Sequence, residues 1–433
     1  MKILSITAGA AGMYCGSCFR DNALAAELLA RGHDVTLQPV YTPTLVDEPN
    51  VSAPTVRFGG INIYLQQSSA LFRRMPRLIE RLLDSPRVIR TLARGSTTDA
   101  RLLGDLTLST LDGRGGVLRK EFDKLVDWIR SEPLPDVINI PNSLLIAMAA
   151  PLREATGRPV CCTLQGEELF LNGLLPAYRA RALEAIQRQV PTVDRFIAVS
   201  DYCASFMTDL LRIPAARIDV VPLGINLQGY ERRQTPRDRF AVGYFARVAP
   251  EKGLQELARA YVAFRRRAGR AEARLEVAGY MAPSQSGYLE GARAILEGAG
   301  YGGEFSYHGA VDRKGKLAFL HELDVLSVPA TYDEPKGMFL LEAMASGVPV
   351  VQPRRGAFTE VVEKTGGGLL VTPDDAESLA DGLHALWSDR DRARALGRQA
   401  FEGVRAHYSI HQSAARLIEV YQATVGERRT SVA

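Results

Sequence analysis

Short β-prone runs alternate with longer helix-prone stretches from the first residue of the chain. In the first half, the β-prone runs are residues 3–7, 35–40, 137–140, 160–164 and 196–200. Apolar residues recur at helical spacing between residues 19 and 31, and Gly32 follows as a helix stop. Strands that alternate with helices are typical of a parallel sheet that helices cover on both faces. The first half is therefore predicted to form such a sheet.

The same alternation begins again after a polar, arginine-rich stretch at residues 230–239. Its β-prone runs are residues 240–245, 274–278, 325–328, 348–352 and 368–371, and helix-prone stretches lie at 253–265 and 314–322. Two successive patterns predict an α/β fold, with two Rossmann-like domains that face a central cleft. We assign residues 1–225 to the first domain and 226–410 to the second. Residues 411–433 form a predicted C-terminal helix, and composition leaves open whether it returns to the first domain.

One segment of the first domain breaks this rhythm, and we treat residues 66–115 as a helical insertion. Residues 66–94 hold seven arginines against two acids, beside an apolar stripe. An ordinary amphipathic helix with a solvated face is the favoured interpretation. Peripheral contact with a membrane through residues 71–94 is the alternative. Pro76 and Pro86 favour several short helices over one long one.

Length and composition are those of an ordinary two-domain globular protein. The chain has 433 residues, of which 46% are hydrophobic and 24% charged, and its net charge of +4 gives no reason to expect nucleic acid. The N-terminus runs directly into a predicted strand, and no stretch reaches the ~18 consecutive apolar residues of a membrane span. Five cysteines, an odd number, do not predict a disulfide framework. We expect a reduced, cytoplasmic protein.

Two glutamates in the second domain have the spacing of a ligand site. Glu334 and Glu342 are separated by a stretch that contains Gly337, and residues 338–346 are good helix formers without Gly or Pro. Glu342 is therefore expected inside a helix, and Glu334 in the loop before its N-terminus. A helix N-terminus binds phosphate through unpaired amides and the macrodipole. In this arrangement the helix amides would bind a diphosphate, and each glutamate would bind hydroxyl groups on one side of it. These are the groups that a nucleotide-sugar presents, so the segment predicts a pocket for a nucleotide-sugar.

Two basic residues follow the first strand of the second domain. Arg247 and Lys252 lie in the loop before the helix-prone stretch at 253–265, where an α/β sheet holds an anion. Arginine binds a diphosphate with a bidentate fork, and lysine acts as a point charge. In an enzyme that breaks a sugar–phosphate bond, such donors stabilise the leaving group by roughly 3 kcal/mol each. The nearby glutamate motif favours this interpretation over two solvated loop residues.

Together these motifs resemble the retaining nucleotide-sugar glycosyltransferases of family 4, which have the GT-B fold. The segment from Glu334 to Glu342 matches the family's Glu-x7-Glu motif, including its glycine. The family's phosphate loop, Gly-x-Arg…Lys-Gly, is present here with its first glycine replaced by Phe245. Further similarities lie at residues 221–226 (Val-Pro-Leu-Gly-Ile-Asn), at residues 197–200, and in the glycine-rich loop at 9–16.

The resemblance implies roles for the matched positions. Glu342 would bind the ribose of the nucleotide, and Glu334 would be a catalytic residue that holds sugar hydroxyls near the anomeric carbon. Arg247 and Lys252 would hold the leaving diphosphate and complete the catalytic set. The other donor contacts would come from the amides of Gly337, Met338 and Phe339, from the backbone at His308 beside the base, and from the loop at Gly12 and Gly16.

The acceptor side of the predicted site is less similar to the family. Position 165 is glutamine, where relatives often have a histidine beside the reacting sugar. Gln165, Glu167 and Tyr14 are our acceptor-side candidates. The family usually has an aromatic residue at the position of Lys336, so the donor pocket is expected to differ there. The acceptor itself is left open among glycans, lipids and small molecules.

The distribution of histidines is consistent with a retaining reaction. None of the six lies between positions 34 and 307, and His33 lies beyond the far end of the first predicted helix. An inverting enzyme of this fold usually needs a base from the first domain to deprotonate the acceptor, commonly a histidine or a carboxylate. A retaining front-face reaction, in which the leaving phosphate assists the acceptor proton, needs none. The resemblance implies transfer of a hexosyl unit from a UDP- or GDP-sugar with retention, and we expect no metal and no other cofactor.

Three other interpretations are weighed against this one. A sugar-nucleotide epimerase or a phosphorylase would use the same fold, but no convincing acid–base set for an epimerase is present in the first domain. A binding module without turnover would not need both basic residues and both glutamates. Cys15 and Cys18 form a Cys-x-x-Cys pair at the start of a predicted helix, where a thiol pKa is lowered. Redox catalysis is disfavoured because nothing else in the chain supports it.

Overall fold

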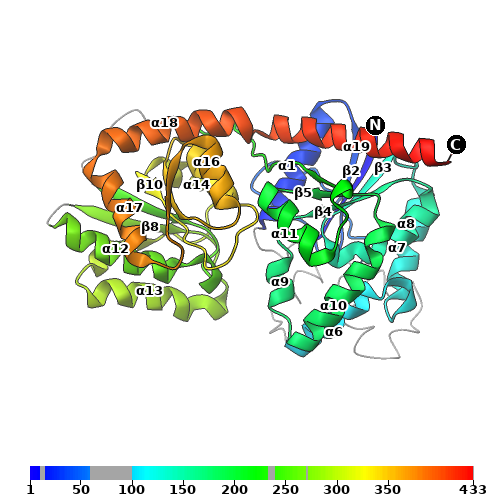
Figure 1. The fold of residues 1–433 in the computed structure, drawn as a ribbon, viewed down its shortest axis with the longest axis horizontal. Helices are drawn as coiled ribbons and strands as arrows, with labels where there is room; N and C mark the ends of the chain where they lie inside the picture. Colours follow the sequence, from blue (N-terminus) through cyan, green and yellow to red (C-terminus); the bar gives the residue numbers. More distant parts are fainter. Residues whose placement is uncertain (10–14, 59–99, 233–238, 270–271, 433) are drawn as a thin grey trace. The chain divides into compact units, whose positions relative to one another are not determined.

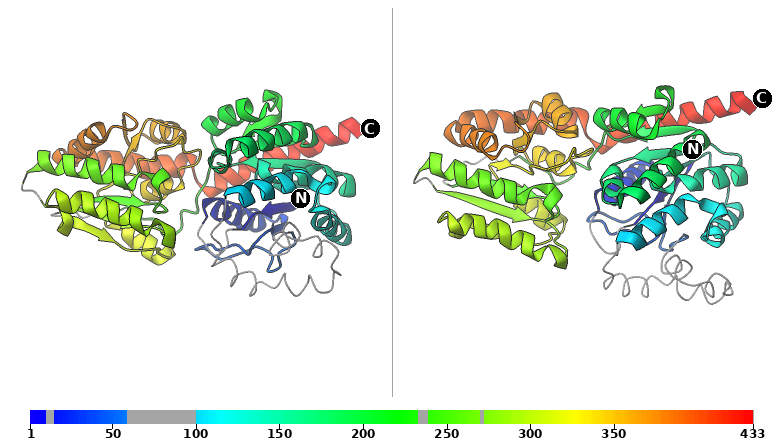
Figure 2. Two further views of the ribbon diagram at one scale, coloured as in Figure 1. Left: turned by 90° about the horizontal axis from the view of Figure 1, so that it is seen from below. Right: turned by 60° about the horizontal axis from the view of Figure 1, so that its bottom comes forward.

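The chain folds into two α/β units in the computed structural model, which describes residues 1–9, 15–58, 100–232, 239–269 and 272–432. Unit 1 comprises Met1–Pro222 together with Ser413–Ala433, and unit 2 comprises Leu223–Gln412. Within the described residues, each unit contains one six-stranded sheet with helices on both faces (Figure 1 and Figure 2). The named strands pair in parallel. The prediction of an α/β chain with two Rossmann-like sheets is confirmed.

Unit 1 is built on a sheet with the strand order β2-β1-β3-β4-β5-β6. Its strands are β1 (Lys2–Thr7), β2 (Asp34–Pro39), β3 (Val137–Ile140), β4 (Val160–Leu164), β5 (Arg195–Ala198) and β6 (Ile218–Val220). Its α-helices include α1 (Gly16–Ala30), α6 (Ala100–Leu111), α7 (Arg119–Ser131), α8 (Ala149–Thr156), α9 (Glu168–Asn172), α10 (Pro176–Gln189) and α11 (Asp201–Leu211). β3 and β4 are buried at every position, because helices cover both faces of the sheet.

Unit 2 has the strand order β12-β11-β10-β7-β8-β9, which is that of the doubly wound nucleotide-binding fold. Its strands are β7 (Phe240–Phe245), β8 (Ala273–Ala278), β9 (Phe305–Tyr307), β10 (Val325–Leu326), β11 (Val350–Pro353) and β12 (Gly368–Val371). Its α-helices include α12 (Leu254–Ala268), α13 (Ser286–Gly298), α14 (Arg313–His321), α15 (Met338–Ala345), α16 (Ala357–Thr365), α17 (Ala376–Ser388) and α18 (Arg390–His407). Each unit has its own apolar core.

The observed strands differ from the predicted ones mainly at their ends. β5 ends at Ala198 rather than at residue 200, because Ser200 is the N-cap of α11 and accepts a hydrogen bond from the Cys203 amide at 3.0 Å. The pattern did not predict β6 or β9, which are three residues long and lie at the edges of their sheets. A run of three residues carries too little periodicity to be distinguished from a loop.

The last helix, α19 (Ile410–Val432), begins in unit 2 and belongs to unit 1 from Ser413 onward. Its Tyr421 is 1% exposed, in a cavity that β1 and α1 also line. Arg416 donates to the carboxylate of Asp219, in β6, at 2.8 Å. These contacts attach the C-terminal end of the chain to the sheet of unit 1.

The arginine-rich insertion predicted at residues 66–115 lies mostly outside the described residues, which resume at Ala100 with α6. Membrane contact through residues 71–94 therefore stays a prediction. Among the helices that the structure does describe, none combines the length and the apolar character that crossing a bilayer requires.

Candidate functional site

The strand order of unit 2 reverses between β7 and β10. These strands are neighbours, with Val325 opposite Val242. The segments that follow them also meet, because the Thr331 amide donates to the Glu251 carbonyl oxygen at 3.0 Å. In a doubly wound sheet, ligands bind at the carboxyl ends of the strands, where the order reverses. The two motifs singled out in the sequence of unit 2 lie on these two segments.

Gly253 allows the two segments to lie this close. Its φ of +74° is in the left-handed region, and a Cβ at this position would lie 1.9 Å from the Pro329 carbonyl oxygen. Gly253 ends the short turn η5 (Pro250–Lys252) and caps α12. Lys252 is thereby held against the chain that follows β10. Of the Lys-Gly pair in the sequence, one residue supplies charge and the other permits close approach of the backbone.

Lys252 and Glu334 form a buried ion pair, and the Tyr332 hydroxyl donates to the same carboxylate. The Lys252 ammonium also donates to that hydroxyl at 2.8 Å. Burial by itself would raise the pKa of Glu334, but the charge of Lys252 and hydrogen bonds from Lys252 and Tyr332 outweigh burial and lower the pKa to about 2. The carboxylate is therefore ionised at neutral pH and can accept hydrogen bonds from hydroxyl groups.

Arg247 is more exposed than Lys252 and is paired with Glu251, four residues later. Its side chain is 46% exposed, whereas that of Lys252 is 13% exposed. Both cations predicted to bind a diphosphate thus lie next to a carboxylate. An anionic ligand would have to compete with these carboxylates or bind beside them. Arg247 is the better placed to change partner, because an exposed ion pair contributes little stability.

Gly337 starts α15 with a left-handed backbone conformation, at φ +70°. The first intrahelical hydrogen bond runs from the Leu340 amide to the Gly337 carbonyl at 2.9 Å, so the amides of Met338 and Phe339 precede it. The Lys252 ammonium lies 5.5 Å from the centroid of the Phe339 ring. The structure therefore brings the Lys252–Glu334 pair to the N-terminus of α15.

Glu342 lies inside α15 and is held by side chains from two other segments. Lys316 of α14 donates to its carboxylate at 2.7 Å, and the Tyr230 hydroxyl donates to the same oxygen at 3.3 Å. Burial, together with the negative charge of Glu342, raises the pKa of Tyr230 well above its ordinary value. Lys316 and Glu342 are both buried, so each charge offsets the other inside the unit.

His308 follows β9, and Glu276 of β8 orients its ring. The imidazole Nε2 lies 2.7 Å from the Glu276 carboxylate, and the ring packs edge-on against Phe319 with 5.5 Å between centroids. The histidine side chain is 45% exposed. The imidazole is thus fixed in orientation by the protein and still accessible to a ligand.

In unit 1, the acceptor-side candidates Gln165 and Glu167 follow β4. The two oxygens of the Glu167 carboxylate accept hydrogen bonds from the amides of Ser143 at 2.9 Å and Gln165 at 2.8 Å. The Gln165 side-chain amide donates to the Pro141 carbonyl oxygen at 2.9 Å. Glu167 therefore joins the segments that follow β3 and β4, and it holds Gln165 in place.

The glycine-rich loop after β1 contributes one described candidate. Gly16 is the first residue of α1, and Cys15 before it is the extended N-cap. Gly12 and Tyr14 lie outside the described residues, so their predicted contacts stay predictions.

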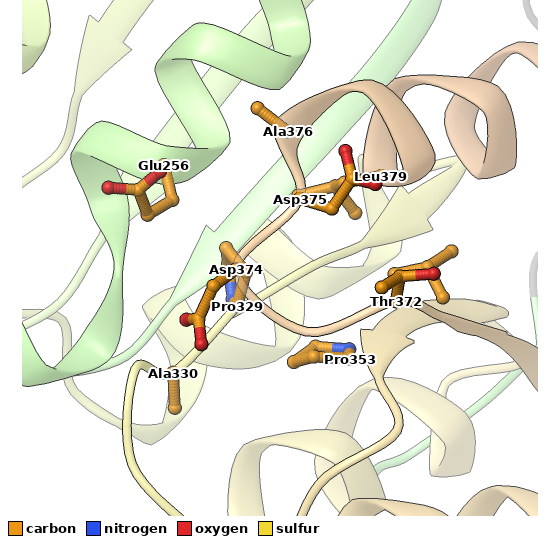
Figure 3. Close-up of a pocket in the computed structure, with 10 residues that line it drawn as sticks. Glu256, Pro329, Ala330, Pro353, Thr372, Asp374, Asp375, Ala376 and Leu379 are labelled. Atoms are coloured by element: carbon orange, nitrogen blue, oxygen red, sulfur yellow. The ribbon is translucent and has the colours of Figure 1, made fainter.

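A pocket at the carboxyl ends of β10, β11 and β12 does not include the predicted site residues (Figure 3). It is lined by Glu256, Pro329, Ala330, Pro353, Val371, Thr372, Asp374, Asp375, Ala376 and Leu379. Asp375 caps α17 by accepting hydrogen bonds from the amides of Glu377 and Ser378, each at 3.0 Å. Because a carboxylate already occupies this helix N-terminus, the pocket is a poor site for a phosphate.

Sequence reasoning did not identify the side chains that hold the two glutamates, namely Tyr332, Lys316 and Tyr230. A signal for Lys316 exists. It precedes Phe319 and Leu320 by three and four positions, which places a lysine on the buried face of a predicted helix. A buried lysine indicates an acidic partner. Tyr230 and Tyr332 lie in loops and carry no such pattern.

Two family models match the chain. The model described as glycosyl transferases group 1 matches residues 230–403, which include every site residue discussed in unit 2. The model described as Glycosyltransferase Family 4 matches residues 107–228, most of them in unit 1.

Relatives with assigned activities match over about half of the chain or more. The chain is 32% identical over 255 residues to a D-inositol 3-phosphate glycosyltransferase of Nocardia farcinica, covering 55% of this chain and 54% of the relative. It is 29% identical over 292 residues to a GDP-mannose-dependent alpha-(1-6)-phosphatidylinositol monomannoside mannosyltransferase of Mycobacterium tuberculosis, covering 63% of this chain and 72% of the relative. The chain thus spans about half the length of the first relative and more of the second.

Solved structures match over nearly the whole chain. A sucrose-phosphate synthase from Thermosynechococcus elongatus has a TM-score of 0.71 at 20% identity, covering 98% of this chain and 99% of that one. Anabaena HepE, solved in complex with UDP and glucose, has a TM-score of 0.67 at 17% identity, covering 98% and 100%. At these identities the similarity concerns the fold alone, and it agrees with the two Rossmann-like sheets described above.

Proposed function

The chain belongs to the family 4 glycosyltransferases of GT-B fold, and we propose that it transfers a hexosyl unit from a nucleotide diphosphosugar to an acceptor hydroxyl with retention at the anomeric carbon. The observation that carries this proposal is the assembly at the switch point of unit 2. Lys252, the ionised Glu334 and the N-terminus of α15 lie together there. A cation, a carboxylate and helix amides are groups that bind a diphosphate and sugar hydroxyls.

The proposed reaction gives each of these groups a task. Glu334 holds hydroxyls of the donor sugar near the anomeric carbon. The bond between that carbon and the phosphate oxygen breaks, and Arg247 and Lys252 stabilise the charge that develops on the leaving diphosphate. The acceptor oxygen bonds to the anomeric carbon on the same face, and its proton passes to the leaving phosphate. The reaction as proposed needs no metal, so transfer is expected to persist in EDTA.

Other residues are proposed to bind the nucleotide and the acceptor. Glu342 is proposed to bind the ribose, and the region of His308 to border the base. UDP and GDP are the donor nucleotides proposed, since one relative is named as GDP-mannose-dependent and one similar structure contains UDP. On the acceptor side we propose that Gln165 contacts the acceptor and that Glu167 holds Gln165 in position. Glycans, lipids and small molecules with a free hydroxyl are the acceptor classes to test.

Nucleotide-dependent thermal stabilisation tests the donor site. The full chain is heated with UDP, GDP, ADP, TDP and their sugars, as wild type and as Glu342→Gln, which keeps a hydrogen-bond acceptor for Lys316. One nucleotide is expected to stabilise the wild type, by about 2.7 kcal/mol at a hundredfold excess over Kd. Glu342→Gln should lose most of this gain.

Glu256→Gln is the matched control, because Glu256 lines the pocket of Figure 3 rather than the proposed site. It should keep the full stabilisation. A panel in which no nucleotide stabilises the wild type would overturn the donor site. Equal losses in the two variants would show that the site is misplaced.

Product analysis then separates transfer from the alternative activities. A transferase releases free nucleoside diphosphate only when acceptor is present, whereas an epimerase releases none. The anomeric configuration of the product, read from proton coupling constants by NMR, should equal that of the donor. An inverted product would contradict retention.

A further inference from the structure

The five cysteines of the chain lie in two environments. Cys161 and Cys162 of β4 and Cys203 of α11 are at most 1% exposed. Burial raises the pKa of the Cys161 thiol to about 12, as expected for an unreactive core cysteine. Cys15 and Cys18 lie instead at the N-terminus of α1, and the proposed transfer reaction uses neither thiol.

The backbone holds Cys15 and Cys18 within the range of a disulfide. Cys15 is the N-cap of α1, and the Phe19 amide donates to its carbonyl at 3.0 Å, so Gly16, Ser17 and Cys18 form the first turn. Residues three apart in an α-helix have Cα atoms roughly 5 Å apart. Disulfides usually span about 4.4–6.8 Å between Cα atoms. The Cα spacing of the pair is therefore that of a disulfide.

The two thiols differ in access. Cys15 is half-buried, whereas Cys18 is 1% exposed. The Cys18 thiol is hydrogen-bonded to the Cys15 sulfur, and this bond, together with burial, raises the pKa of Cys18. A helix N-terminus favours the thiolate form of a cysteine. Cys15 thus has the features of an attacking thiol, and Cys18 those of a protected thiol that reacts second.

We propose that Cys15 and Cys18 form a reversible dithiol–disulfide pair that hydroperoxides oxidise. The Cys15 thiolate attacks the terminal peroxide oxygen, and the O–O bond breaks. The other oxygen takes up the proton that the Cys15 thiol released and leaves as an alcohol, or as water if the peroxide is hydrogen peroxide. The Cys18 sulfur then attacks the sulfur of the resulting sulfenic acid, the disulfide forms, and the hydroxyl group leaves with the Cys18 proton as one water. The pair gives up two electrons and two hydrogens, and the peroxide is reduced by the same two electrons.

This proposal does not depend on the proposed transfer activity. The disulfide closes a ring that contains Gly16 and Ser17 and ties the N-cap to the first turn of α1. The redox state of the pair therefore sets how firmly the start of this helix is held.

Thiol mapping after peroxide treatment tests the proposal. The reduced full chain is exposed to hydrogen peroxide, denatured, alkylated and digested with trypsin, so that residues 3–20 form one peptide with both cysteines. This peptide is expected to carry no alkyl group and to be lighter by two hydrogens than the same peptide with two free thiols. Reduction with dithiothreitol should make both cysteines available for alkylation again. The peptides that carry Cys161, Cys162 and Cys203 should stay alkylated. A 3–20 peptide that stays fully alkylated while peroxide is consumed would overturn the proposal.

Single variants test the order of the two steps. In Cys18→Ser, no thiol at position 18 can attack the sulfenic acid at Cys15. Dimedone should therefore trap this sulfenic acid, whereas it forms little adduct in the wild type. In Cys15→Ser, residue 18 should remain an unmodified thiol. Equal dimedone labelling of Cys15 in the wild type and in Cys18→Ser would show that Cys18 does not react second. The wild-type mapping stands by itself if a variant fails to fold.

Discussion

Individual side chains set the charge of the candidate site, and each glutamate of the motif has an ammonium partner. Lys252 pairs with Glu334, and Lys316 pairs with Glu342. All four side chains are at most 13% exposed, so both ion pairs lie largely out of solvent. The sequence shows the spacing of the glutamates, but not that Lys252 and Lys316 are their partners.

The lowered pKa of Glu334 predicts an acid-dependent loss of stability. Its value is about 2 in the folded chain against an ordinary 4.5, so the folded state binds fewer protons between these values. The stabilisation is complete above about pH 4.5 and is lost as the pH falls toward 2. A shift of this size corresponds to roughly 3 kcal/mol. Urea unfolding should show that the free energy of unfolding falls less between pH 7 and pH 3 in Glu334→Gln than in the wild type. An equal fall in both proteins would mean that the Glu334 carboxyl does not titrate as described.

The buried Lys316–Glu342 pair predicts strong coupling between its partners. Lys316→Met leaves the Glu342 carboxylate buried without its ammonium, which typically costs about 3–5 kcal/mol. In a double-mutant cycle, the double variant Lys316→Met/Glu342→Gln should lose clearly less stability than the sum of the losses in the two single variants. Lys314→Met is the matched control on the same helix, since Lys314 is exposed. Additive losses in the cycle would contradict the coupling.

At the scale of elements, the strand order brings the two motifs together. β7 and β10 are neighbours in the sheet although the strands β8 and β9 lie between them in the sequence. The segments after these two strands meet because Gly253 lets backbone lie against backbone at Pro329. The position of Lys252 beside Glu334 thus depends on a glycine as well as on the two charges.

Gly253→Ala is expected to separate the two segments. A Cβ at 1.9 Å from the Pro329 carbonyl oxygen cannot be accommodated without moving the backbone. Gly300→Ala is the matched control, because Gly300 also has a positive φ, of +84°, but its Cβ would meet nothing within 4 Å. The control should lose only about 1–2 kcal/mol of stability, which is the cost of the left-handed conformation for a residue with a Cβ. Chemical denaturation should give a larger loss for Gly253→Ala, and similar losses would show that the close approach is unimportant.

At the scale of the whole molecule, the last helix of the chain begins in one unit and continues into the other. α19 begins in unit 2, and its residues from Ser413 onward belong to unit 1. Leu417, Val420 and Tyr421 of this helix are buried. The stability of unit 1 therefore depends on the C-terminal segment of the chain, because these buried side chains belong to that unit.

Removal of residues 413–433 should destabilise unit 1 selectively. Each large apolar side chain that loses its burial removes roughly 1.5–3 kcal/mol. Differential scanning calorimetry should show one transition moved to lower temperature, while the transition that responds to added nucleotide stays unchanged. Gln422→Ala, an exposed change on the same helix, should move neither transition. Loss of the nucleotide-linked transition on truncation would contradict this division of stability.

The sequence by itself determined the local features of this protein. The two α/β patterns, the helix that contains Glu342 and the loop that contains Glu334 all follow from hydrophobic spacing and from glycine positions within short windows. The motifs also identified the family, because their residue types and spacings are local. β6 and β9 were not predicted, because a strand of three residues is too short to show a hydrophobic period.

Only the tertiary structure decided which charges meet. Lys252 and Glu334 are 82 positions apart, and Lys316 and Glu342 are 26 apart. Both pairs bring together residues from separate segments of unit 2. The hydrophobic pattern specifies that strands exist, but not the order in which they lie side by side. The meeting of Lys252 with Glu334 follows from that order. The lowered pKa of Glu334 follows from this contact, because a pKa responds to neighbours in space rather than in sequence.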